Sequence, residues 1–186
     1  IKRHLGYEVY WNLYHAVLSH DEKKGDAILG TMLEAKEIPN SKKIMNHLTS
    51  PYVRKVFELS RAVSNEAHYH KEFVRFRELE NGVLFAKINP KAQVLTCIAD
   101  HFSNRLPLEN WLVYDETHKM VLVHEARKHW IILIDEEMES EKVKKYSQRR
   151  CLKHFGETFV KQSLFRNEKT RSFNANIFLY GIEGIW

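Results

Sequence analysis

The pair Asn81-Gly82 lies between two runs of alternating residues and constrains the fold of this 186-residue chain more than any other short feature. Asn-Gly is the strongest short signal for a two-residue hairpin turn, because both central residues of a type I′ turn need a positive φ. A hairpin folded about this pair would align Leu79 with Leu84, Arg77 with Ala86, and Arg75 with Ile88. The sequence therefore predicts two antiparallel strands that meet at residues 81–82.

Apolar residues at helical spacing predict that the chain before this hairpin is helical. The pattern favours helices over 10–18 and around 28–33, the second with Asp26 as its N-cap. Ser41 is predicted to cap a short helix. Ser50 precedes a proline, which is typical of a cap residue followed by the first helical position, so another helix is expected to begin there.

Strand patterns follow the hairpin, after one more helix, at 111–115, 120–125 and 129–135. This order predicts an α+β fold with an N-terminal helical subdomain, a ββ-α-βββ mostly antiparallel sheet and a C-terminal basic helix. We expect a single domain over 1–186, within which 1–70 can form the helical subdomain.

Basic charge is concentrated near the C-terminus. The net charge is +5, yet the segment from Lys142 to Arg171 alone carries ten Lys/Arg and two acids, directly after an acidic stretch at 135–141. Such asymmetry favours a surface that faces a polyanion, most simply DNA, although a solvated helix face would show the same composition. The residues of this segment that we expect to contact nucleic acid are Lys145, Arg149, Arg150 and Lys153.

Cysteine content and hydropathy narrow the class of protein. The two cysteines, Cys97 and Cys151, are too few for a four-cysteine zinc site or an iron–sulfur cluster in this chain alone. The longest apolar run, WIILI, is far shorter than the roughly 20 residues of a membrane span, and no signal-peptide pattern opens the sequence. We expect a cytoplasmic protein with no cofactor, no metal and no membrane partner.

Glu66, His68 and His70 lie two residues apart, just before the hairpin. On a strand they would share a face and could hold a metal ion, whereas on a helix positions i and i+2 diverge. The preceding periodicity favours a helix through His68, and therefore favours structural histidines held by hydrogen bonds.

Arg75 and Arg77 would project from one face of the predicted hairpin, about 7 Å apart by the strand rise. Two guanidinium groups at that spacing can grip two phosphates or carboxylates. The alternative is an internal ion pair with an acid of the chain. The candidate acids are Glu66, Asp100 and Asp115.

The second candidate site in the central part of the chain is a polar cleft. His101 and Arg105 lie four residues apart and share a helix face, so Arg105 joins the candidate anion-binding residues. His68, His101 and Asp115 are the candidate catalytic residues of a phosphodiesterase or base-processing hydrolase. No G-x-S-x-G, Walker, G-x-G-x-x-G or H-E-x-x-H motif accompanies them.

The stretches NEAHYHKEFVRFRELENGVLFAKINP and IADHFSNRLPLENWLVYD resemble a bacterial family described as probable DNA metabolism proteins. The family pattern reads approximately N-E-A-H, K-G-F-x-R-F-R-E-L, H-F-x-x-R-x-P, W and D, and Glu72 departs from its glycine. The matching residues are Asn65, Glu66, Ala67, His68, Lys71, Phe73, Arg75, Phe76, Arg77, Glu78, Leu79, His101, Phe102, Arg105, Pro107, Trp111 and Asp115.

The resemblance implies partnership with a radical-SAM protein of DNA modification or repair and, in some members, fusion to a uracil-DNA-glycosylase-like domain. It assigns no catalytic residue. We therefore expect a DNA-associated accessory protein that binds nucleic acid or a repair enzyme. A hydrolase and a protein-interaction scaffold are the alternatives.

Overall fold

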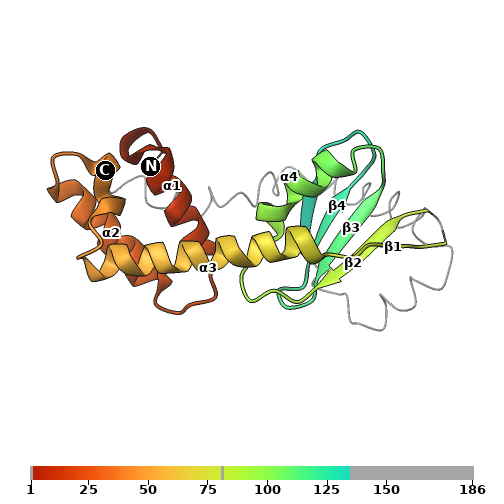
Figure 1. The fold of residues 1–186 in the computed structure, drawn as a ribbon, viewed down its shortest axis with the longest axis horizontal. Coiled ribbons are helices and arrows are strands. Elements are labelled where there is room, and N and C mark those ends of the chain that lie inside the picture. Colours follow the sequence, from red (N-terminus) through yellow and green to blue (C-terminus); the bar gives the residue numbers. More distant parts are fainter. Residues whose placement is uncertain (1, 81, 135–186) are drawn as a thin grey trace. The chain divides into compact units, whose positions relative to one another are not determined.

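The computed structural model describes residues 2–80 and 82–134, which Figure 1 shows as coloured ribbon. These residues form two compact units. The first unit holds 2–69 together with the short stretch 91–94, and the second holds the other described residues. None of the helices in the described part of the chain combines the length and the apolar composition that crossing a bilayer requires.

The first unit is helical. Its elements are α1 (Lys2–Leu18), α2 (Lys24–Glu37), the 3-10 helix η1 (Ser41–Asn46) and the greater part of α3 (Pro51–Phe73). One apolar face of each element packs into a shared core. The core side chains include Val9, Leu13, Ile28, Met32, Ile44, Val53 and Val56. The predicted helical start of the chain is thus confirmed.

The predicted helix caps are only partly right. The hydroxyl of Ser50 accepts a hydrogen bond from the N–H of Val53 at 3.4 Å, so the predicted cap of α3 is confirmed. Asp26 lies in the first turn of α2 rather than at its N-cap. The cap of η1 is Asn40 instead of Ser41, because the Asn40 side chain reaches the N–H two residues ahead.

The second unit is built on a five-stranded sheet in the order β1-β2-β3-β4-β5. Its elements are β1 (Arg77–Glu78), β2 (Leu84–Ile88), α4 (Leu95–Arg105), β3 (Trp111–Asp115), β4 (Met120–His124) and β5 (Ile131–Ile134). Among the strands of the described residues, only β2 and β3 pair in parallel, because α4 carries the chain back to the starting end of the sheet. The mostly antiparallel ββ-α-βββ order is confirmed.

The predicted register of the first hairpin is wrong by one residue. Arg77 pairs with Phe85 rather than Ala86, and the N–H of Leu79 donates to the carbonyl of Val83 at 2.9 Å. This hydrogen bond encloses a loop of three residues, 80–82, where a loop of two residues was predicted. Gly82 has a φ of 77°, the left-handed conformation that closes a three-residue hairpin loop. Asn-Gly marks the turn in both loop types, so the dipeptide alone does not set the register.

The shift of one residue places Arg77 on the same face as Phe85. Its guanidinium carbon lies 4.9 Å from the centre of the Phe85 ring, a cation–π distance. Arg75 precedes β1, which begins at Arg77. The joint binding of an anion by Arg75 and Arg77, which are both exposed, stays a prediction.

Candidate anion-binding site on helix α4

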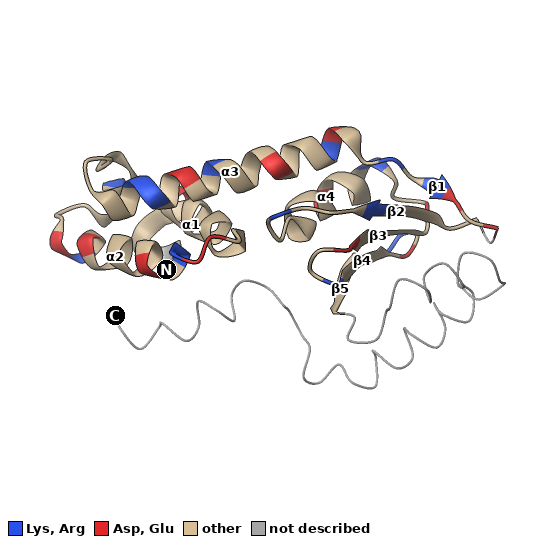
Figure 2. Ribbon diagram, turned by 90° about the horizontal axis from the view of Figure 1, so that it is seen from below, with Lys and Arg blue, Asp and Glu red and all other residues tan. Residues whose placement is uncertain are grey.

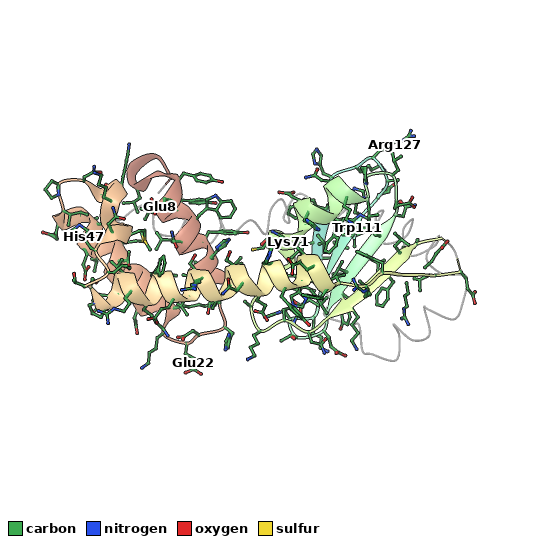
Figure 3. All side chains as sticks on the ribbon, viewed as in Figure 1. Glu8, Glu22, His47, Lys71, Trp111 and Arg127 are labelled. Carbon is green, nitrogen blue, oxygen red and sulfur yellow. The ribbon has the colours of Figure 1, made fainter. Side chains whose placement is uncertain are left out.

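Cys97, His101 and Arg105 form a row along α4, because each lies four residues after the last. Lys71, in the last turn of α3, belongs to the same unit and extends toward the side where α4 lies (Figure 3). Its charge acts on the titration of both Cys97 and His101. The cationic cluster, defined here as Lys71, His101 and Arg105, thus gathers three basic side chains from two helices.

Burial and charge both make the His101 ring resist protonation. Desolvation lowers its pKa below the ordinary histidine value, and the positive charges of Lys71 and Arg105 lower the pKa further. The ring atom Nε2 is buried and has no hydrogen-bond partner among the described residues. A buried polar atom without a partner is costly, so a ligand that bonds to this atom would gain stability from it.

Lys71 and Arg105 have no acidic partner among the described residues. Among the residues that the structure describes, neither forms a salt bridge, whereas Lys87 pairs with Glu116 and Lys128 pairs with Glu125. Uncompensated positive charge beside a desolvated imidazole favours an anion. Guanidinium and ammonium groups are the donors that proteins use for phosphate oxygens.

An aromatic core fixes α4 against the sheet. The ring centroids of Phe76 and Phe102 are 5.2 Å apart, and each lies 6.1 Å from that of Trp111. On its other side the Trp111 indole stacks on His124 at 4.9 Å. The Trp130 indole N–H also donates to Asp100 on α4 at 2.7 Å. The position of His101 and Arg105 therefore rests on a rigid helix rather than on a loop.

Glu66 has a structural role inside the first unit. Its two carboxylate oxygens accept hydrogen bonds from the backbone N–H groups of Lys91, at 2.7 Å, and Ala92, at 2.9 Å. Residues 66–70 are helical, so the predicted helix through His68 is confirmed. The strand geometry that would have turned Glu66, His68 and His70 into one metal site does not occur.

Asp115 ends β3 and holds the turn that follows. Its buried carboxylate accepts the backbone N–H of His118 at 3.0 Å, and the His118 Nδ1 atom lies 2.6 Å from the other oxygen. Since an ionised carboxylate only accepts, Nδ1 is the donor. This arrangement fixes the imidazole and closes the β3–β4 hairpin. Asp115 therefore faces His118, a residue that no sequence pattern singles out.

The structure brings only some of the predicted site residues together. His101 and Arg105 share the face of α4, as predicted, and Lys71 joins them. His68 belongs to the first unit, and Arg75 and Arg77 lie exposed around the start of β1. The sequence could have pointed to Lys71 as a site residue, because Lys71 is one of the residues that match the family pattern. No sequence signal points to His118.

Two further features of the prediction concern metals and the basic segment. Within 2–80 and 82–134, no three His, Cys, Asp or Glu side chains come close enough to hold a metal ion. The segment from Lys142 to Arg171 lies outside the described residues. Its candidate nucleic-acid contacts therefore stay predictions, as does the basic helix. They are Lys145, Arg149, Arg150 and Lys153.

His101 should bind anions more tightly as the pH falls. Its pKa is below the ordinary value of about 6.5 when the site is free, and a bound phosphate would raise that pKa by favouring the imidazolium form. The complex then holds more protons than the free protein between the two pKa values. Affinity should rise as pH falls through the bound pKa and level off below the free one.

The His101 imidazole resonance, followed by NMR over a pH titration with and without inorganic phosphate, measures both pKa values. We expect the phosphate sample to titrate at the higher pH, with the exposed His47 as the control residue. Identical His101 titrations in the two samples would contradict an anion at this ring.

A family model described as a domain of unknown function, DUF4130, matches residues 7–172. The match spans most of the chain and includes all residues of the cationic cluster. Among curated proteins no match is found, and none among solved structures.

Proposed function

This chain belongs to the family of the domain of unknown function DUF4130, and we propose that it is a nucleic-acid-binding accessory protein of DNA repair or modification. The observation that carries the proposal is the cationic cluster. Among the described residues, Lys71 on α3 and Arg105 on α4 form no salt bridge, and the ring atom Nε2 of His101 on α4 has no hydrogen-bond partner.

The roles of the residues in the family pattern support this choice. Phe76, Phe102 and Trp111 build the aromatic core, and Glu66 and Asp115 hold backbone segments. These residues have a structural reason to be present. The His101 ring packs edge-on against Phe102, whereas Lys71 and Arg105 form no salt bridge with the described residues, so binding is the better explanation for these two charges.

The local arrangement of the cationic cluster, rather than the net charge, makes the second unit suitable for binding phosphates. The described residues of the second unit hold eight Lys/Arg and eight Asp/Glu, and Figure 2 shows a basic and an acidic residue next to each other on β1. A balanced unit would not attract polyanions from a distance. We propose that the basic segment from Lys142 to Arg171 supplies that attraction, and that the cationic cluster holds a backbone phosphate once the DNA has docked.

The proposed setting follows from the resemblance to DNA metabolism proteins. In it, a radical-SAM protein or a glycosylase carries out the chemistry, and this chain helps to hold the DNA. A docking role through protein contacts alone is the alternative. The two differ in whether the isolated chain binds DNA.

A double substitution tests the role of the cluster. Replacing Lys71 and Arg105 with serine should weaken DNA binding, measured by fluorescence anisotropy, and should reduce the log–log salt slope by about 1 for each phosphate that is no longer neutralised. The matched control replaces Arg127 and Lys128, two exposed cations of the same unit (Arg127 is labelled in Figure 3), which changes the net charge equally. An equal decrease in affinity in the two variants would mean that the cluster is no specific site.

A further inference from the structure

The sheet of the second unit has an apolar face on the side away from α4. Side chains alternate between the two faces of a strand, so Trp111, which contacts Phe102 of α4, and Leu112 point to opposite faces. The register of the sheet brings four buried side chains together on the face that includes Leu112. This α4-distal face is made of Phe85, Leu112, Tyr114 and Val121.

The side chains of the α4-distal face are buried, although no helix of the described residues contributes to their cluster. Leu112 is 9% exposed, Val121 is 4% exposed and Tyr114 is 2% exposed. The partly buried side chains that pack against them come from the sheet and its first hairpin, namely Leu79, Val83 and Val123. An antiparallel sheet that lacks a second layer leaves one face in water. The burial of this face therefore calls for a layer beyond residues 2–80 and 82–134.

The chain itself continues from the edge of this face. Leu133 of β5 pairs with Val121 and so lies on the same face, one residue before β5 ends at Ile134. Residues 135–151 then lead to an apolar triplet, Leu152, Phe155 and Phe159. An extended linker of that length reaches up to about 55 Å, whereas five strands are only about 20 Å across. A segment tethered so closely has an effective concentration on the order of millimolar, which favours it over a separate molecule.

The apolar triplet has the spacing of a packing helix face. Leu152, Phe155 and Phe159 lie at i, i+3 and i+7, so they share one side of the helix that the sequence predicts for this segment. Arg150 and Lys153 lie on other sides of such a helix. The segment can therefore bury its apolar side against a sheet while these two cations stay in solvent.

We propose that the segment from Lys142 to Arg171 packs on the α4-distal face through its apolar triplet and forms the second layer of the sheet. The Tyr114 hydroxyl is buried on this face and has no hydrogen-bond partner among the described residues, so a polar group of the segment would satisfy it. The inference goes beyond the proposed function, because it says where the chain holds its basic segment and does not require that the segment binds DNA.

The test is NMR of the intact chain with labelled methyl groups and aromatic rings. We expect nuclear Overhauser effects (NOEs) between the rings of Phe155 and Phe159 and the methyl groups of Leu112 and Val121. The methyl groups of Val113, which alternates to the α4 side, are the control and should show none to these rings. NOEs to Val113 instead, or none to Leu112 and Val121, would overturn the inference. So would NOEs that appear only between differently labelled molecules in a mixed sample, because a second copy would then cover the face.

A pair of variants separates packing from charge. Phe155→Ser combined with Phe159→Ser should shift the methyl resonances of the α4-distal face and increase the fluorescence of a dye that binds exposed apolar surface. Arg150→Ser combined with Lys153→Ser, the matched control, should leave both signals at the parent values. Parent-like methyl resonances in the phenylalanine variant would contradict the packing. If that variant does not fold by circular dichroism, the NOEs of the parent chain decide.

Discussion

Replacing Trp111 with alanine should lower the free energy of unfolding by about 3–5 kcal/mol, the range for removing a fully buried large aromatic side chain. Trp111 has no exposed surface and contacts Phe76, Phe102 and His124. Its removal would leave a cavity between α4 and the sheet that these rings cannot fill by small movements. Urea denaturation of the variant and the parent measures this difference in the free energy of unfolding.

Trp111→Phe sharpens this prediction. The indole N–H of Trp111 is buried without a hydrogen-bond partner among the described residues, so phenylalanine removes no hydrogen bond and keeps a ring against Phe76 and Phe102. Its cost should be well below that of alanine. Leu108→Ala, at a 63% exposed position, should change stability by no more than about 0.5 kcal/mol. Equal stability of Trp111→Ala and the parent would show that this aromatic core is not formed.

The second large effect concerns the basic segment. Its positive charges make phosphate binding the expected mode of association, and each phosphate that is no longer neutralised changes the log–log salt slope by about 0.9 on duplex DNA. Serine at the four candidate positions should therefore reduce the magnitude of the slope by up to about 3.6 if all four bind phosphates. The substituted residues are Lys145, Arg149, Arg150 and Lys153.

A variant with the same change in net charge separates local binding from general attraction. Four exposed cations of the first unit serve this purpose, namely Lys23, Lys36, Arg61 and Lys91. Serine at these positions should alter the slope far less than serine in the basic segment. If both quadruple variants keep the parent affinity at every salt concentration, the basic segment is a solvated face and the DNA partner rests on the resemblance and the cationic cluster.

Much of the fold was predictable because local patterns and tertiary packing agree. The strands β3, β4 and β5 and the helix start beside Ser50 follow from alternation and capping, which depend on a few neighbouring residues. The hairpin register did not follow. Two-residue and three-residue loops both accept Asn-Gly, and the choice between them depends on how Phe85 packs across the sheet.

The candidate site was predictable only where it lies on one helix. His101 and Arg105 are four residues apart, so helical geometry alone places them together. Lys71 comes from another helix and reaches them through the packing of the second unit, which no local pattern reveals. The sequence suggests a cleft in which Asp115 joins His101, yet the Asp115 carboxylate bonds to His118 three residues away. This pairing depends on the turn after β3, which the sequence pattern did not reveal, and the catalytic role of Asp115 stays a prediction.

The binding of the intact chain to DNA as a function of salt concentration tests the central proposal most directly. We expect saturable binding whose affinity falls linearly on a log–log plot, with a slope of about −0.9 for each phosphate neutralised on a duplex. The slope should be less steep for the Lys71→Ser, Arg105→Ser protein. The absence of saturable binding at the lowest salt concentration, with the protein folded by circular dichroism, would contradict the proposal and favour a scaffold that contacts only proteins.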